Sequence, residues 1–176
     1  AGQAHLDVEM SGQMGDPVLS GSLGIDDLWF SGFPLGNLKT ESLRFVPLVV
    51  EVAEGTLTKG GSEWQLKNAS IDFDSDATIR AEASVRSRRM DLRDFFAMWR
   101  FDEDPRWDSI HGKGGLEARV RYVLGGKDDR CEGGNLDVRG NMSLTTLGMF
   151  EEKYSDAKGS FRFNWFDIDA SYLGMQ

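Results

Sequence analysis

The sequence predicts an all-β protein built from one long, curved antiparallel sheet, with one short amphipathic helix. Apolar and polar residues alternate with a period of two along most of the chain, as in strands with one buried face. Short turns that contain Gly or Asn separate the alternating runs, as antiparallel hairpins require. The composition agrees, because the 176 residues include 21 Gly and 11 Phe but only 4 Pro.

The alternating runs predict about nine to eleven strands, most with one apolar and one charged face. The first runs cover 4–10 and 19–25, separated by a turn that contains Pro17. A change of parity at Pro47, within the run 43–52, indicates a bulge or an edge kink. The later runs cover 64–66, 69–73, 79–85, 116–124, 136–144 and 161–172. Since buried parallel strands would have continuous apolar runs instead, the predicted sheet is antiparallel.

One segment has helical rather than strand periodicity. In "MDLRDFFAMWRF", four apolar residues follow at i, i+3, i+4 and i+7, which places them on one helical face: Leu92, Phe95, Phe96 and Trp99. Asp91 is suited to cap the N-terminus, and Pro105 limits the C-terminal end. The pattern therefore predicts a helical insertion near 91–103 that packs this aromatic stripe over an apolar surface.

No catalytic or metal-binding arrangement is visible in the sequence, so we predict that the protein is not an enzyme and needs no cofactor. His5 and His111 lack a Ser, Cys or carboxylate at a motif spacing. The acidic run 72–76 resembles the start of a calcium loop, but Ala77 and Ala83 occupy the positions that require Gly and Glu. The single Cys131 excludes an internal disulfide.

The charge distribution argues against nucleic acid as a partner. The formal net charge is −9, and the one basic cluster, "RSRRMDLR", lies directly before the predicted helix. Nucleic-acid binding requires a clustered positive surface. The apolar face of the sheet is therefore the remaining candidate for function, because an extended apolar surface must meet lipid, another chain or another sheet.

The parity of each run predicts which residues share that apolar, concave face. These candidate groove residues are Leu23, Ile25, Leu43, Phe45, Ile71, Phe73, Ile79, Val85, Leu116, Val120, Leu136, Val138, Phe161 and Phe163.

The stretch "VEMSGQMGDPVLSGSLGIDDLWFSGFPLGNL" resembles the repeated unit of the AsmA-like superfamily, and within it the TamB-type translocation and assembly module proteins. In that unit a strand ends at a Gly (here Gly12), a turn contains Pro (Pro17), and a Gly-x-Leu strand restarts (21–23). The segment "RRMDLRDFFAMW" is similar to the short helix that interrupts these strands. "GKGGLEARV" and "LDVRGNMSLTTLG" resemble further copies.

The resemblance implies a taco-like β-groove that conducts phospholipid acyl chains between the inner and outer membranes, for outer-membrane biogenesis. It implies a periplasmic location in a diderm bacterium, with an inner-membrane tether elsewhere in a longer chain. The expected partners are flanking repeats of that chain and, in the TamB branch, an outer-membrane barrel-assembly protein that also serves the assembly of outer-membrane proteins and autotransporters. Residues 1–176 would then form a single groove segment.

Two other interpretations stay open at this level. A soluble β-sandwich that serves as a binding or adhesion module also has alternating strands, although its spacing should be more regular. A fragment of a transmembrane β-barrel alternates too, but with strands of more uniform length and no amphipathic helix between them.

Overall fold

The structure is a computed structural model, and it describes residues 2–30, 32–75, 78–124, 135–164 and 168–169. Cys131 and most of the predicted strand pattern at 165–172 lie outside the described residues.

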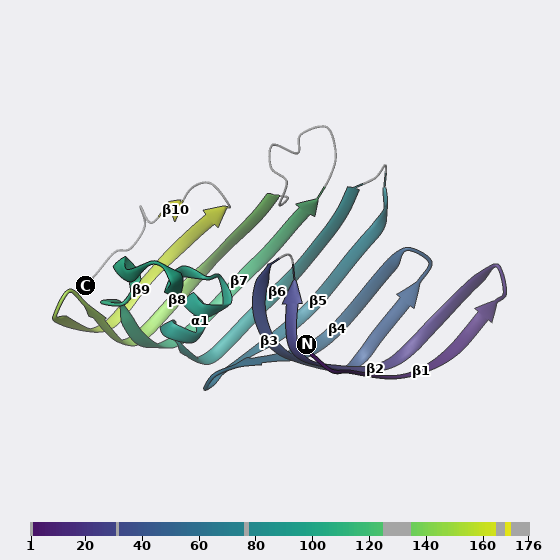
Figure 1. The fold of residues 1–176 in the computed structure, drawn as a ribbon, viewed down its shortest axis with the longest axis horizontal. Helices are drawn as coiled ribbons and strands as arrows, with labels where there is room; N and C mark the ends of the chain where they lie inside the picture. The colour runs from purple at the N-terminus through teal and green to yellow at the C-terminus, as the bar shows by residue number, and fades with distance from the viewer. Residues whose placement is uncertain (1, 31, 76–77, 125–134, 165–167, 170–176) are drawn as a thin grey trace.

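The described residues form one ten-stranded antiparallel sheet in which every strand pairs with its neighbours in the sequence (Figure 1). This confirms the predicted fold class, an all-β open sheet with one short helix, and a single sheet is not the pair of facing sheets that a sandwich requires. The strands are β1 (Ala4–Gln13), β2 (Asp16–Phe30), β3 (Phe33–Val46), β4 (Val49–Lys59), β5 (Ser62–Ser75), β6 (Thr78–Asp91), β7 (His111–Leu124), β8 (Asn135–Met149), β9 (Glu152–Asn164) and the two-residue β10 (Ile168–Asp169).

Two local predictions along the strands were wrong. The parity change at Pro47 is a hairpin turn and not a bulge, because β3 ends at Val46 and β4 begins at Val49. Conversely, the runs on either side of Asn68 belong to one strand, β5. Asn68 adopts a left-handed backbone conformation (φ 50°), which Asn tolerates better than most residues, so the strand continues through an irregularity.

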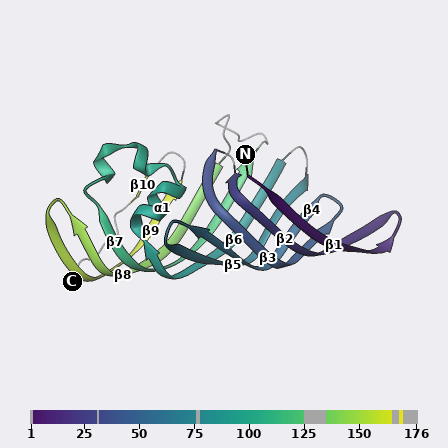
Figure 2. The ribbon, with the colours of Figure 1, turned by 60° about the horizontal axis from the view of Figure 1, so that its bottom comes forward.

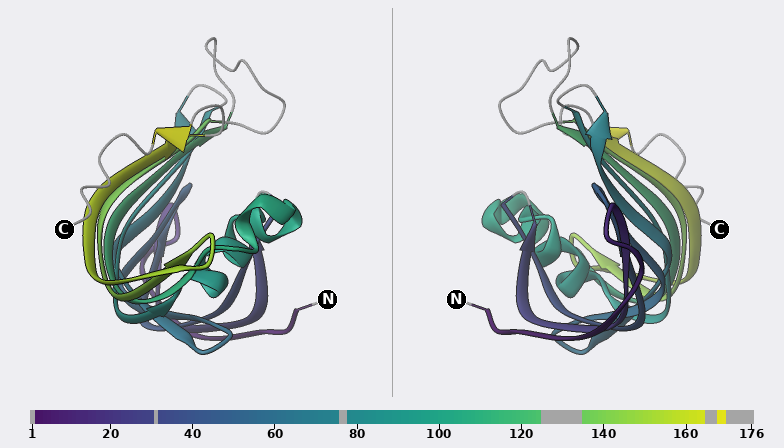
Figure 3. Two further views of the ribbon diagram at one scale, coloured as in Figure 1. Left: turned by 90° about the vertical axis from the view of Figure 1, so that its left-hand side faces the viewer. Right: turned by 90° about the vertical axis from the view of Figure 1, so that its right-hand side faces the viewer.

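The sheet curves into a trough whose strands run from one margin to the other (Figures 2 and 3). The pairing of β2 with β3 is interrupted by register shifts between Gly21 and Leu23 and twice between Ile25 and Trp29, and such irregularities increase twist and bend a strand. Gly36, opposite Leu28, has φ 104°, and a Cβ there would lie 2.2 Å from the Thr58 carbonyl oxygen. Only glycine permits this close approach of β3 to β4.

The connection from β6 to β7 carries all the helical structure among the described residues. α1 (Leu92–Met98) is followed by two 3₁₀ turns, η1 (Phe101–Glu103) and η2 (Pro105–Trp107). The insertion near 91–103 is thus not one continuous helix, because Arg100 turns the backbone into the left-handed region (φ 59°). As predicted, the Asp91 side chain caps α1 by accepting a hydrogen bond from the Arg93 amide.

A hydrogen-bond cluster fixes α1 to the turn between β4 and β5. The Asp94 carboxylate accepts hydrogen bonds from the Ser62 hydroxyl (2.6 Å) and the Gly61 amide (3.0 Å). Ser62 Oγ in turn accepts one from the Asp91 amide (2.8 Å), at the start of the helix. These hydrogen bonds hold the helix at one margin of the trough, from which it projects over the interior (Figure 3).

Candidate functional site

The concave face of the sheet forms a continuous apolar floor. Residues directly opposite each other on antiparallel strands have side chains on the same face, so the register identifies rows that cross the sheet. One row joins Val50, Ile71, Ala81, Tyr122 and Leu136 on five successive strands. A parallel row joins Ala83, Val120, Val138 and Phe163. These rows supply part of the core, since Val138 is 1% exposed and Leu136 and Phe163 are also buried.

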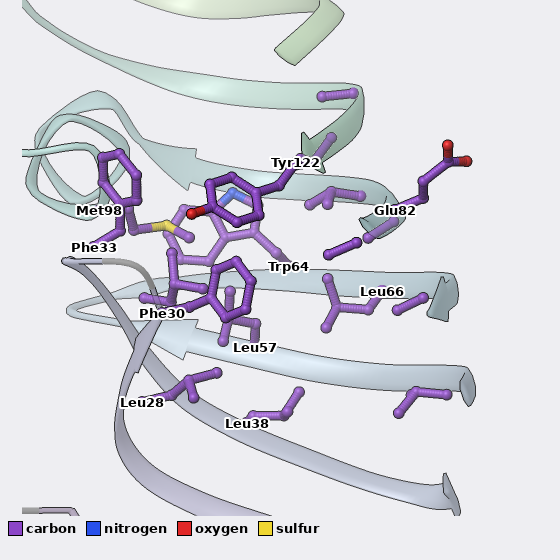
Figure 4. Close-up of a pocket in the computed structure, with 18 of the residues that line it drawn as sticks. Leu28, Phe30, Phe33, Leu38, Leu57, Trp64, Leu66, Glu82, Met98 and Tyr122 are labelled. Carbon is purple, nitrogen blue, oxygen red and sulfur yellow. The ribbon is translucent and has the colours of Figure 1, made fainter. Parts of the chain in front are cut away.

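A cavity of about 280 Å³ lies between this floor and the elements that cover it (Figure 4). Its walls come from β2 to β8 and from α1, including the side chains of Phe95 and Met98 and the adjoining Trp99. We call this cavity, with its lining residues, the chamber. Its size lies near the lower end of the range for small-molecule sites, and an apolar lining is usual for such sites.

The predicted groove residues occupy three places relative to the chamber. Those that line it are Leu23, Ile25, Ile71, Val85, Leu116, Val120, Leu136 and Val138. Phe161 and Phe163 lie under α1 and its following turn, where they contact aromatic rings of that insertion. The remaining four lie beyond the chamber: Leu43 is buried, Ile79 is half-buried, and Phe45 and Phe73 are exposed.

The helical insertion fills the trough over the C-terminal strands. Three of the predicted helix residues, Leu92, Phe95 and Phe96, are buried, and Trp99 is half-buried at the C-cap. The Phe95 ring meets Phe161 edge-on, with 6.0 Å between centroids. Trp99 sits between Phe33 and Phe163, at 5.2 Å from each ring.

The turns after α1 add a second group of rings to this plug. Phe101 stacks on Trp107 with 5.0 Å between centroids, and its edge contacts Phe163 at 5.6 Å. Phe96 packs against Trp107 at 5.2 Å. We call the residues Phe95, Phe96, Trp99, Phe101 and Trp107 the aromatic plug, because together they close the trough above β9.

A separate contact closes the trough nearer its middle. Phe30, at the end of β2, meets Tyr122 of β7 edge-on at 5.3 Å (Figure 4). β2 and β7 are far apart in the sheet order, and Phe30 ends its strand at the margin opposite to the one that Tyr122 approaches. The contact therefore spans the mouth of the trough and makes part of the chamber roof.

Sequence reasoning missed several residues of this roof. Parity counted from Leu23 and Ile25 would point Phe30 outward, but the register shifts near Leu28 reverse it, so that Leu28 and Phe30 face the chamber and Trp29 is exposed. Phe33 and Met98 were missed because they come from a hairpin end and a helix flank. Tyr122 was detectable, since it shares the parity of Val120.

The chamber offers apolar contact and almost no polar chemistry. Glu82 and Ser70 are the polar residues among its lining, and the Glu82 carboxylate points away from it (Figure 4) and pairs with Arg121 at 3.3 Å. Among the described residues, no group of His, Cys, Asp and Glu is arranged to hold a metal ion. A site of this kind can bind an apolar ligand by removing its surface from water.

The convex face carries the charges that alternation predicts. Cross-strand ion pairs join Arg86 to Glu117 (2.9 Å) and Arg162 to Asp137 (3.0 Å). Burial acts to raise the pKa of Asp137, but hydrogen bonds from Arg139 and Arg162 outweigh it, and the pKa of this carboxyl is lowered. The sheet is thus apolar on its concave side and ion-paired on its convex side.

Comparison with known proteins adds no relative: no family model, curated protein or solved structure matches this chain. What the fold and the site define is a class of architecture, an open antiparallel sheet that encloses an apolar chamber. Within the part of the chain that the structure describes, no helix is long and apolar enough to cross a membrane.

Proposed function

We propose that this chain is a lipid-handling groove segment that shelters acyl chains from water. The observation that carries the proposal is the chamber, whose apolar lining is continuous across seven strands while charged side chains lie on the other face. Burying each methylene group of an acyl chain is worth about 0.8 kcal/mol. An apolar trough of this kind suits a ligand made of many methylene groups and needs no catalytic group.

The finer part of the proposal concerns phospholipid transport in the envelope of a diderm bacterium. The sequence resemblance to AsmA-like proteins supports a periplasmic segment of a longer chain tethered to the inner membrane. Flanking repeats would extend the apolar floor toward the outer membrane. The resemblance to the TamB branch also supports a barrel-assembly protein as the partner at that membrane, and a role in outer-membrane protein assembly.

Placing a charge on the chamber floor tests the proposal. Val120 lines the chamber but is only half-buried, so Val120→Glu should leave the sheet folded while it disfavours a bound acyl chain. Val138→Arg is the harsher variant, because Val138 is almost fully buried. We expect Val120→Glu to reduce binding of a fluorescent fatty acid by at least about tenfold, since a desolvated carboxylate costs more than 1.4 kcal/mol.

The matched control is Ser143→Glu, which adds the same charge on an exposed residue of β8. Circular dichroism of all three variants and mass spectrometry of organic extracts from the unmodified protein complete the experiment. Lipid in the extracts, with binding lost in Val120→Glu and kept in Ser143→Glu, supports the groove. A folded Val120→Glu variant that binds as well as the unmodified chain would exclude it.

A further inference from the structure

We infer that acyl chains enter the chamber from a lipid surface across one apolar margin, formed by Phe45, Leu48 and Phe73. We call these three residues the apolar margin. The inference rests on the proposed lipid function and adds to it a place of loading and a direction. It starts from a difference between the C-terminal end of the chamber and the margin at which β3 and β5 end.

The end toward the C-terminal strands is closed. Trp99 fills the space between Phe33 and Phe163, and Phe101 covers Phe163 from the other side. Phe33 and Phe163 are both buried. Rings packed edge-on at 5–6 Å leave no path for an acyl chain, so a chain that moves in this direction meets the aromatic plug.

The margin at which β3 and β5 end and β4 begins continues into solvent. The row that contains Val50 and Ile71 inside the chamber extends to Phe45, the cross-strand partner of Val50 on β3. Phe45 is 38% exposed, and it shares the concave face with Val50. Phe73 lies two residues beyond Ile71, on the same side of β5, and is 44% exposed. The chamber floor thus runs outward onto two exposed phenyl rings.

Leu48 completes the margin in an unusual backbone conformation. It stands in the turn between β3 and β4 with φ 65°, a left-handed conformation that glycine or asparagine adopts more readily than leucine. Its side chain is 51% exposed, although its carbonyl oxygen accepts a hydrogen bond from the Phe73 amide at 2.8 Å. A strained residue that also exposes apolar surface is a reason to look for function.

A lipid surface fits this margin better than a protein partner does. All three residues are apolar, and Phe45 is the cross-strand partner of the chamber residue Val50, so a chain that leaves a bilayer at Phe45 would stay in apolar contact until it reaches Val50. The nearest ion pair on the same hairpin, Arg44 with Glu51, satisfies its own charges at 2.6 Å on the convex face. Aromatic and aliphatic side chains of this kind insert into the interface of a bilayer.

The experiment separates loading rate from binding capacity. The full chain is mixed with phosphatidylcholine vesicles that contain a fluorescent phosphatidylcholine, and transfer to the protein is followed in time. Capacity is measured separately at equilibrium, with the same lipid dispersed in detergent. The test variant is Phe45→Gln/Phe73→Gln, and the control is Phe150→Gln, which removes a 68% exposed ring at the turn between β8 and β9.

We expect the double variant to load from vesicles about tenfold more slowly, because two apolar membrane contacts are lost, and to keep its equilibrium capacity within about twofold. The control should load at the unmodified rate.

If the double variant loads from vesicles as fast as the control, the margin is not the site of loading, while the lipid function stays intact. If the unmodified chain takes up no lipid even from detergent, the proposed function itself fails. Analytical ultracentrifugation gives the remaining outcome. If the unmodified chain self-associates and the double variant does not, the margin is a contact between two copies of the chain and not a lipid-loading site.

Discussion

At the scale of single residues, the position of a side chain relative to the sheet decides its role. Val138 and Arg139 are neighbours in β8, yet the first is 1% exposed in the core and the second forms an ion pair with Asp137 on the convex face. Asp137 accepts hydrogen bonds from two arginines, Arg139 and Arg162. Protonation of Asp137 would therefore weaken two ion pairs at once.

The Asp137 carboxylate should make the stability of the fold depend on pH. Its folded pKa is lowered, so its contribution is fully present above the unfolded value of about 3.9 and is lost as the pH falls through the lower folded pKa. Asp137→Asn should be less stable than the unmodified chain at pH 7. Urea denaturation from pH 7 to pH 2 should show this difference shrinking below about pH 4. A difference that stays constant over the whole range would contradict the assignment.

At the scale of elements, α1 is too short to be stable alone and depends on its contacts. Its apolar face packs against β3, β6 and β7, and Asp94 fixes it to the turn at Gly61 and Ser62. Within the described residues, the buried Trp99 Nε1 has no hydrogen-bond partner. Such an unpaired donor costs about 1–3 kcal/mol, so the insertion combines hydrogen-bonded anchoring at one end with an unsatisfied donor at the other.

Removing the Asp94 carboxylate should therefore loosen the aromatic plug without unfolding the sheet. Asp94→Ala removes two hydrogen bonds and leaves the buried Ser62 hydroxyl without its acceptor. We expect a loss of about 1–3 kcal/mol in the free energy of unfolding and faster hydrogen exchange at the amides of Phe95 and Phe96.

The control for this prediction is Arg93→Ala, the exposed neighbour on the same helix. It should change both quantities little, because helix propensity favours Ala at least as well as Arg. If hydrogen exchange at Phe95 and Phe96 becomes faster by the same factor in Asp94→Ala and Arg93→Ala, the apolar contacts alone hold the helix in place.

The strands and the helix also show how much of this fold can be predicted from the sequence. Alternation identified part of each long strand and the antiparallel sheet, although it missed the first halves of β3 and β9. The helical stripe identified α1 to within a few residues, because both are local patterns. The chamber roof was not predictable in the same way. Phe30 faces inward only because bulges near Leu28 shift the parity, and its partner Tyr122 lies on a distant strand. Bulges and the sheet curvature they produce depend on the backbone of two strands at once, which no periodicity records.

At the scale of the whole molecule, the curvature of the sheet creates the chamber. A flat sheet with the same register would leave the concave row exposed, whereas the trough brings the end of β2 over β7 and the helical insertion over β9 (Figure 3). The apolar surface that remains uncovered lies toward the N-terminal strands, where Leu6 and Met10 of β1 are exposed. The molecule therefore has a closed end and an open end, and the contact between Phe30 and Tyr122 marks where the covered part begins.

A double-mutant cycle on Phe30 and Tyr122 tests whether the trough is closed in solution. Phe30→Leu and Tyr122→Leu should each lower the free energy of unfolding. Together they should lower it by less than the sum, with a coupling of about 0.5–1.5 kcal/mol for an edge-on aromatic pair.

The matched cycle pairs Trp29→Leu with Tyr122→Leu, since Trp29 is the neighbour of Phe30 but is 62% exposed. That second cycle should be additive to within about 0.5 kcal/mol. Coupling between Phe30 and Tyr122 requires the two distant strands to meet, so additivity in both cycles would mean that the roof is open and that acyl chains could reach the floor along its whole length.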